Sequence, residues 1–244
     1  MKILGNIYYY LIVTLLYLHC FTMENSNLQI KIRSSLFSKD PESSDLGRDI
    51  ISKSIEMINL LGFESFTFKK LGAAIGSNES SVYRYFSNKH MLLVYLVNWY
   101  WSWMDYKIVL ETSKLNKAED KIKMSIELLV ADIKQDSNFS FINEVLLNKI
   151  IITESSKAYH TKDVDNENEK GFYKAYKQVV QRVSDFILEY NPKYEFPHML
   201  VSTIIEGAHQ QRYFAEHLPA LTDVEKGQNN IIRFYTNLII STLK

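Results

Sequence analysis

The sequence has little cysteine, proline or glycine: its 244 residues include one Cys, four Pro and eight Gly. The single cysteine, Cys20, cannot form an internal disulfide or a cysteine-rich zinc cage, so the fold requires no oxidising compartment and we expect no redox-sensor role. The low Gly and Pro content excludes a collagen-like chain, and the 46% of hydrophobic residues excludes a largely disordered one. The composition is that of a globular protein with one large core or two modest ones.

The sequence also has no excess of charge of either sign, because 28 Lys and Arg residues balance 28 Asp and Glu residues. A chain without net charge cannot hold nucleic acid through its total charge, so any such binding must come from a local patch. The six histidines include no pair at the i, i+4 spacing that would indicate a metal site. No nucleophile with a neighbouring base and no glycine-rich phosphate loop is visible, so we expect neither an enzyme nor a cofactor.

The N-terminal segment is apolar. Residues 3–21 contain few polar side chains and are long enough for a membrane helix or for the core of a signal peptide. The flank fits a signal peptide poorly, because His19 and other bulky residues stand where small residues precede a cleavage site. Three interpretations stay open: an upstream extension with the natural start at Met23, a membrane anchor, and a cleaved signal. We favour the first and expect a cytoplasmic protein, with membrane anchoring as the alternative. Residues 1–44 then comprise this extension and a polar, mobile arm.

Beyond Ser44 nearly every apolar run has helical spacing, and no β-rich block is visible, which predicts an all-α fold. Ile51, Ile55 and Ile58 at i, i+4 and i+7 predict a first helix, and Gly62 should end it.

Two short helices and one long helix should follow. The hydroxyl of Thr67 can cap a second helix that ends at Gly76. A third begins almost at once, capped by Ser77 or Asn78. A long fourth helix should start near Lys89, and its apolar residues on more than one face predict that other elements cover it on several sides.

The remaining sequence predicts further amphipathic helices. Apolar stripes run over residues 122–133, 141–150 and 172–187, and another helix should begin at Pro197. The acidic stretch 163–169 is expected to be a solvated loop. Thr222 and Glu225 form a capping box that should open the last helix.

The two short helices, braced by the helix before them, match a helix-turn-helix, in which the second short helix enters the DNA major groove. The side chains suit this function. Phosphate can be bound by Thr67, Ser80, Ser81, Tyr83 and Lys89. Arg84 can bind a phosphate or the N7 and O6 atoms of guanine. Six basic residues against four acidic ones between residues 46 and 91 make the patch only mildly basic.

Three segments carry a resemblance to a known family. They are Gly62-Phe63 to Thr67, Leu71-Gly72-Ala73-Ala74-Ile75-Gly76 and, most specifically, Ser80-Ser81-Val82-Tyr83-Arg84-Tyr85-Phe86-Ser87-Asn88-Lys89. They look like the DNA-binding domain of TetR-type transcriptional regulators. The resemblance is close over roughly residues 46–95, and beyond them only the count, length and order of the helices agree. It implies a helix-turn-helix domain at residues 45–92 and a helical effector-binding and dimerisation domain at residues 93–244.

The resemblance also implies a homodimer that binds a palindromic operator, together with roles for single residues. Thr67 and Tyr83 would contact phosphate, Lys89 would hold the DNA backbone, and the second short helix would face the groove. The candidate DNA-contacting residues are Thr67, Lys69, Asn78, Glu79, Ser80, Ser81, Tyr83, Arg84 and Lys89.

Three residues depart from the family's pattern. Gly72 stands where Ala is usual, Ser77 where an apolar residue is usual, and Glu79 where Lys or Arg is common. We expect the first two to loosen the motif and Glu79 to reduce the attraction to phosphate. Glu79 can instead read cytosine N4, or favour the helix terminus.

An effector pocket is expected beneath the fourth helix. A ligand bound there can shift this helix, which is the element connected to the DNA-binding unit. The expected lining residues are Trp99, Trp103, Ile126, Val145 and Tyr176. The 16 Tyr, 13 Phe and 3 Trp favour a small hydrophobic or aromatic effector. The three tryptophans of this helix, which include Trp101, cannot all share one face. Packing is their default role, and ligand stacking by at least one of them is the alternative.

The dimer interface is expected in the last two long helices, about Pro197–His217 and Asp223–Leu243. The resemblance places a four-helix bundle there, and both segments carry apolar stripes. The candidate interface residues are Val201, Ile204, Ala208, Ile232, Tyr235 and Ile239.

The sequence thus predicts a ligand-responsive, DNA-binding transcriptional repressor. Its expected partners are double-stranded operator DNA, a small hydrophobic or aromatic effector, and a second copy of the chain. The alternative is a helical small-molecule-binding or membrane-tethered sensor with weak or no DNA binding. This alternative is suggested by the weak positive charge of the helix-turn-helix, by Glu79 and by the apolar N-terminal segment.

Overall fold

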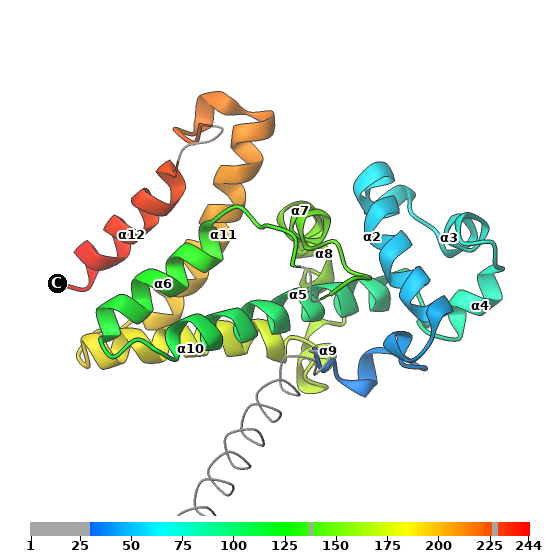
Figure 1. Ribbon diagram of the computed structural model, residues 1–244, viewed down its shortest axis with the longest axis horizontal. Coiled ribbons are helices and arrows are strands. Elements are labelled where there is room, and N and C mark those ends of the chain that lie inside the picture. Colours follow the sequence, from blue (N-terminus) through cyan, green and yellow to red (C-terminus); the bar gives the residue numbers. More distant parts are fainter. Residues whose placement is uncertain (1–29, 137–138, 226–228) are drawn as a thin grey trace, which may run out of the picture.

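The computed structural model describes residues 30–136, 139–225 and 229–244. Every regular element in these ranges is helical, which confirms the predicted all-α fold (Figure 1). The elements are the 3-10 helices η1 (Ser34–Leu36), η2 (Pro41–Ser43) and η3 (Pro219–Leu221), and the α-helices α2 (Asp45–Ser65), α3 (Phe68–Ala74), α4 (Glu79–Tyr83), α5 (Lys89–Thr112), α6 (Ala118–Val130), α7 (Glu144–Glu154), α8 (Ser156–Tyr159), α9 (Val164–Glu169), α10 (Lys174–Tyr190), α11 (Pro197–His217) and α12 (Asn230–Thr242). None of these helices is long and apolar enough to cross a membrane. The apolar stretch 3–21 lies outside the described residues.

Helices α2, α3 and α4 form an N-terminal unit at one end of the molecule (Figure 1). Ile51, Ile55 and Ile58 of α2 are buried, as their spacing predicts. The helical path of α2 breaks at Gly62, whose backbone angles are φ 75° and ψ 155°, so the predicted stop is confirmed.

The segment before α2 is packed onto the protein from Ile30 onward, so the expectation of a mobile arm is wrong for residues 30–44. Leu36 is fully buried. The Ser38 amide donates to the Tyr85 carbonyl at 2.8 Å. The reason is that a few apolar side chains, such as that of Leu36, are enough to hold a polar segment in place when they are buried against the rest of the protein.

Helix α5 is the central element. Residues 92–101 are all buried, so the helix is covered on every side, as its unpatterned apolar sequence predicts. It packs against η1, α6, α7, α8 and α10. It runs from the N-terminal unit into the body formed by the later helices (Figure 1). One continuous helix therefore joins the two parts of the molecule.

The body is built around α5 in successive contacts. Helices α6 and α10 pack against α5 and against each other, α11 packs against α10, α7 and α6, and α12 packs against α6 and α11. Helix α12 lies at the end of the molecule opposite α3 and α4 (Figure 1). Helices α3 and α4 are therefore spatially separate from the last helix.

Two boundary predictions are wrong. The acidic stretch 163–169 was expected to be a loop, but it contains the short helix α9, because Glu167 turns inward and is only 7% exposed. The last helix begins at Asn230 and not at Asp223. Thr222 Oγ1 accepts a hydrogen bond from the Val224 amide at 3.2 Å, which closes a local turn instead of capping a helix.

His209 on α11 gives the fold a pH dependence. Burial lowers the pKa of His209 to about 4, against the opposing influence of Glu206. The unfolded chain binds this proton near pH 6.5, so the free energy of unfolding should fall as the pH decreases from about 6.5 to about 4. We expect a loss of about 2 kcal/mol between pH 7.5 and pH 5 from urea unfolding, and a smaller loss for His209→Gln. His217→Gln, on the same helix but exposed, is the control. Equal pH dependence in the wild type and His209→Gln would contradict this assignment.

Candidate nucleic-acid interface and effector cavity

Three side chains cap the helices of the N-terminal unit. Thr67 caps α3, Asn78 caps α4 and Asn88 caps α5. Each accepts a hydrogen bond from the amide three residues later, at 3.2, 2.8 and 2.9 Å respectively. These bonds satisfy amides that a helix leaves without partners at its start. The predicted cap at Thr67 is confirmed, and of the two candidates for α4 the structure uses Asn78.

The turn between α3 and α4 depends on two glycines. Gly76 has φ 65°, a left-handed conformation that strains other residues. A Cβ at position 72 would lie 2.9 Å from the carbonyl carbon of Asn78. Gly72 therefore brings α3 close to the start of α4, where we had expected it to loosen the motif.

Most candidate DNA-contacting residues lie on the surface of α3, α4 and the adjoining turns. The exposed ones are Thr67, Lys69, Asn78, Ser80, Tyr83 and Arg84. Glu79 and Lys89 are half-buried and Ser81 is buried. The Ser81 hydroxyl donates to Asn78 Oδ1 at 2.9 Å and accepts from Arg84 Nη2 at 3.2 Å. Ser81 thus orients Arg84 from within the fold, while Arg84 itself stays exposed.

Three aromatic residues of α4 and the turn after it divide between surface and core. Tyr83 is 48% exposed, and its ring lies edge-on to Phe68 with centroids 5.0 Å apart. Tyr85 and Phe86 are buried. The rigid ring of Tyr83 is therefore available to a partner, whereas its neighbours hold α4 in place.

Lys89 lies at the first position of α5 and makes contacts within the chain. Its Nζ donates to the carbonyl oxygens of Phe63 and Glu64, both at 3.0 Å, and to that of Phe66 at 3.5 Å. The same atom lies 4.8 Å from the centre of the Phe63 ring. Lys89 therefore ties the end of α2 to the start of α5, a positioning role that its sequence does not reveal.

A cavity of about 540 Å³ lies beside α5, between α9, α10 and the first part of α11. Its size is within the range of small-molecule sites. Tyr176, one of the candidate effector-contacting residues, and Trp101 line it. Trp99 and Trp103 are fully buried, where they stack with ring centroids 6.2 Å apart, and Ile126 is also buried in the core. Val145 lines a different hollow, next to Arg212.

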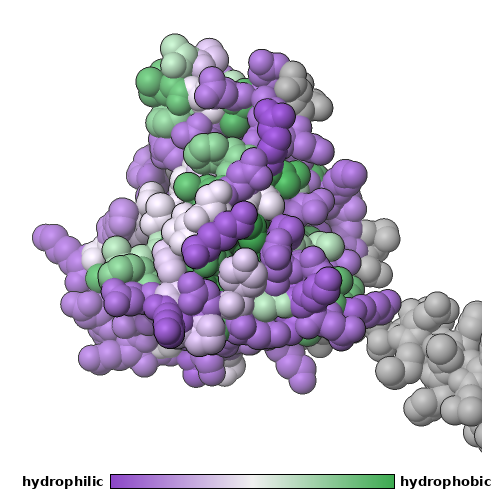
Figure 2. Space-filling model, turned by 90° about the vertical axis from the view of Figure 1, so that its left-hand side faces the viewer, coloured by the Kyte–Doolittle hydropathy of each residue, from purple (hydrophilic) through white to green (hydrophobic). Residues whose placement is uncertain are grey.

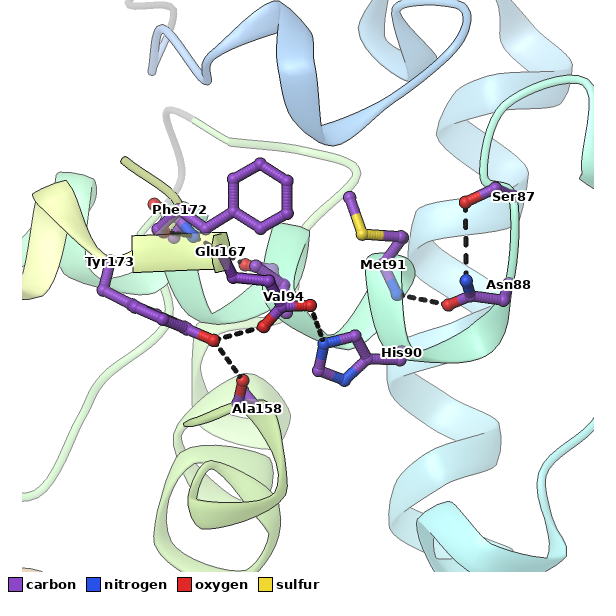
Figure 3. A network of polar contacts seen from close by, with 10 residues as sticks. Ser87, Asn88, His90, Met91, Val94, Ala158, Glu167, Phe172 and Tyr173 are labelled. Atoms are coloured by element: carbon purple, nitrogen blue, oxygen red, sulfur yellow. Dashed lines mark hydrogen bonds and ion pairs between the residues drawn. The ribbon is translucent and has the colours of Figure 1, made fainter. Parts of the chain in front are cut away.

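A chain of polar contacts runs from the cavity wall to the start of α5 (Figure 3). Glu167 of α9 is its centre, and its Oε1 lies 2.7 Å from His90 Nε2. On the other side the Tyr173 hydroxyl lies between the Glu167 carboxyl group and the Ala158 carbonyl oxygen, the latter at 2.9 Å. Burial and Glu167 raise the pKa of Tyr173, so the hydroxyl keeps its proton. Sequence reasoning missed Glu167, because a buried acid within an acidic run looks like its solvated neighbours.

The residues predicted for the dimer interface lie mostly inside the body of the single chain. Val201, Ile204, Ala208, Tyr235 and Ile239 are buried, and Ile232 is half-buried. Other apolar residues of the last two helices are exposed: Phe234 by 58%, Leu238 by 38% and Met199 by 67%. Figure 2 shows the end of the molecule that carries α12, where hydrophobic residues interrupt the hydrophilic surface.

The N-terminal unit matches a known family. Residues 50–96 fit the model of the bacterial regulatory proteins of the tetR family. No curated protein matches the sequence significantly.

Solved structures match the fold over most of the chain. The fatty acid degradation regulator FadR from Bacillus halodurans is 15% identical, with a TM-score of 0.57 over 80% of this chain and 95% of that one. AibR in complex with isovaleryl coenzyme A and operator DNA is 9% identical, with a TM-score of 0.54 over 80% and 97%. The superantigen PfiT is 12% identical, with a TM-score of 0.55 over 83% and 97%.

The matched family is one of regulatory proteins and not of enzymes. Residues 50–96 are therefore similar to the DNA-binding domain of tetR-family regulatory proteins, and the solved structures share the all-helical fold of most of the chain. This confirms the resemblance read from the sequence.

Proposed function

We propose that the chain is a ligand-responsive transcriptional repressor that binds a palindromic operator as a homodimer in the cytoplasm. The observation that carries this proposal is the exposed surface of α4 and its C-cap residue, on which Ser80, Tyr83 and Arg84 follow a capped and close-packed turn. A recognition helix needs this arrangement, because its side chains must reach base edges while the rest of the motif holds the backbone. One such short helix makes few contacts, so useful affinity requires two copies.

The exposed residues divide by the DNA group that each can bind. Thr67, Lys69 and Tyr83 suit phosphate, whereas Arg84 suits a guanine edge or a phosphate. Glu79 is half-buried in the first turn of α4, where a carboxylate favours the helix dipole. AibR, which shares the fold, has been solved with both an acyl coenzyme A and operator DNA, which supports a DNA-binding and ligand-binding role here.

Lys69 provides a test of DNA binding that leaves the fold unchanged, since it is exposed on α3. Lys69→Ala should weaken binding to all duplexes alike and reduce the slope of log K against log salt by about one, because one phosphate contact is lost. Fluorescence anisotropy at several salt concentrations measures this. Lys193→Ala removes the same charge from the loop before α11 and should leave both quantities unchanged.

The operator itself is sought by footprinting the full chain on the DNA that flanks its own gene. We expect a protected, nearly palindromic site. Absence of any protected palindrome at moderate salt, with folding verified by circular dichroism, would contradict the repressor function and favour a small-molecule-binding protein without strong DNA affinity.

The homodimer is proposed to form through the exposed apolar side of α12. Phe234 and Leu238 are four residues apart and share one face of this helix, while Tyr235 and Ile239 face the body. We propose that a second copy of the chain covers this apolar side, because binding to a two-fold symmetric operator requires two copies.

Phe234→Asp tests this interface, because a carboxylate in an apolar interface has no partner and costs several kcal/mol. We expect the variant to be monomeric by light scattering but folded. Leu60→Asp changes an apolar residue of α2 that is 82% exposed and should stay dimeric. Ile204→Glu is not a test of the interface, since Ile204 is fully buried and its replacement should unfold the chain. A dimeric Phe234→Asp variant would move the interface elsewhere.

The effector is proposed to act through α9. Val164, Asp165 and Asn168 of α9 line the cavity, while Glu167 of the same helix contacts His90 in the first turn of α5. A ligand that displaces α9 therefore changes a contact directly beside Lys89, which ties α5 to the end of α2. The ligand must bind the DNA-incompetent state more tightly for this to release DNA, and operator DNA must weaken the ligand equally.

Glu167→Leu should uncouple the two sites. Hydrophobic compounds are screened by thermal shift, and the operator affinity is measured with and without each hit. In the wild type we expect the ligand to change the operator affinity by roughly 5- to 150-fold. In Glu167→Leu we expect the ligand still to bind but to leave the operator affinity almost unchanged. Glu189→Leu removes a carboxylate from an exposed ion pair with Lys121 and should keep the wild-type coupling. Undiminished coupling in Glu167→Leu would show that the signal takes another route.

A further inference from the structure

The wall of the cavity beside α5 indicates the chemistry of its ligand. We infer that the cavity binds an uncharged, planar aromatic molecule whose inner end carries a hydrogen-bond donor, as in a phenol or an aryl amine. This inference rests on the proposed function only in taking that molecule as the effector. The binding site itself is defined by the cavity walls.

The preference for a planar aromatic molecule comes from the rings in the wall. Trp101 and Tyr176 stack at 4.4 Å between ring centroids, with an angle of 21° between their planes. Both line the cavity, as does Phe172, and Trp101 is only 3% exposed. These residues give the cavity a rigid aromatic side, against which flat rings pack with more contact area than puckered ones.

The preference for a donor comes from Asn98, a cavity-lining residue that is 5% exposed. Its Nδ2 donates to the carbonyl oxygens of Val94 at 2.8 Å and Phe172 at 2.6 Å. Both amide hydrogens are therefore used, which fixes the orientation of the side chain. Within the described ranges Oδ1 accepts no hydrogen bond. A hydroxyl or amine of a ligand can donate to Oδ1, whereas a ligand that covers Oδ1 without supplying a donor leaves this acceptor unpaired, which is unfavourable.

The preference for an uncharged molecule comes from the distribution of charge. Two residues of the lining carry a permanent charge, Asp165 and Lys177; they have opposite signs and both are exposed. Behind Trp101, the His209 ring lies 6.1 Å away, centroid to centroid, and its pKa of about 4 keeps it neutral. Two carboxylates outside the lining, Glu167 and Glu206, accept from the Tyr173 and Tyr176 hydroxyls. A negative charge at the inner end of the ligand would therefore lack a counter-charge, which makes its burial unfavourable.

Calorimetric titration of the full chain without DNA tests each preference with matched probes. We expect 2-naphthol to bind roughly ten-fold more tightly than 2-methoxynaphthalene, which lacks the donor. It should also bind more tightly than decahydro-2-naphthol, which keeps the hydroxyl but is not planar, and than 2-naphthoate, which is charged.

Two variants locate the contacts. Asn98→Leu should bring 2-naphthol and 2-methoxynaphthalene to the same affinity, and Tyr176→Leu should weaken both. Asn148→Leu makes the same change on α7, where Asn148 Oδ1 accepts from the Tyr100 hydroxyl, and should preserve the preference for 2-naphthol. Circular dichroism verifies that each variant is folded. If Asn98→Leu does not fold, the variant of the half-buried Tyr176 and the four probes on the wild type still decide the question.

Equal affinity for 2-naphthol and 2-methoxynaphthalene, tighter binding of 2-naphthoate, or no binding of any probe would overturn the inference. Binding of 2-naphthol with the expected preference, but without any change in operator affinity, would support the ligand class and contradict the effector role. The two proposals therefore fail separately.

Discussion

The complete burial of α5 is the constraint on which the rest of the structure depends. A helix with apolar residues on all sides cannot remain in water, so α6, α7, α8 and α10 have to surround it. The first turn of the same helix carries Lys89 and His90, which contact the end of α2 and the buried Glu167. Helix α5 is thus the core around which the body packs. Through Lys89 and His90 it also contacts the N-terminal unit and the wall of the cavity.

The N-terminal unit could be predicted from the sequence because its signals are local. Thr67 and Asn78 cap helices through amides three residues away, and Gly76 adopts a conformation that few other residues tolerate. Such signals need no knowledge of the rest of the chain. The position of Lys89 is different: its residue type suggested a phosphate contact, whereas its bonds to three carbonyl groups depend on how α2 and α5 meet.

The body could be predicted only in outline, because an apolar pattern shows that a residue is buried but not what covers it. Trp99 and Trp101 lie on the same helix, yet only Trp101 borders the cavity, since empty space depends on how α9 and α10 pack. The apolar stripe of α12 likewise does not distinguish an internal core from an external interface. The structure turns Ile239 inward and leaves Phe234 exposed. The inward turn of Glu167 has no sequence signal, because its partners are far away in the chain.

Several contacts at the junction between the N-terminal unit and the body join a side chain to a backbone atom. Asn59 donates to the Leu146 carbonyl oxygen at 2.9 Å, Glu154 accepts from the Phe63 amide at 3.1 Å, and Arg33 donates to the Gly171 carbonyl oxygen at 3.2 Å. Every residue type offers the same backbone carbonyl, and all but proline offer the same amide. Each contact therefore restricts the residue type only at the position that supplies the side chain. The position that supplies the backbone atom can be substituted without losing the hydrogen bond. A body attached in this way can change most of its side chains, and with them the molecule it recognises, while the junction to the N-terminal unit keeps its geometry.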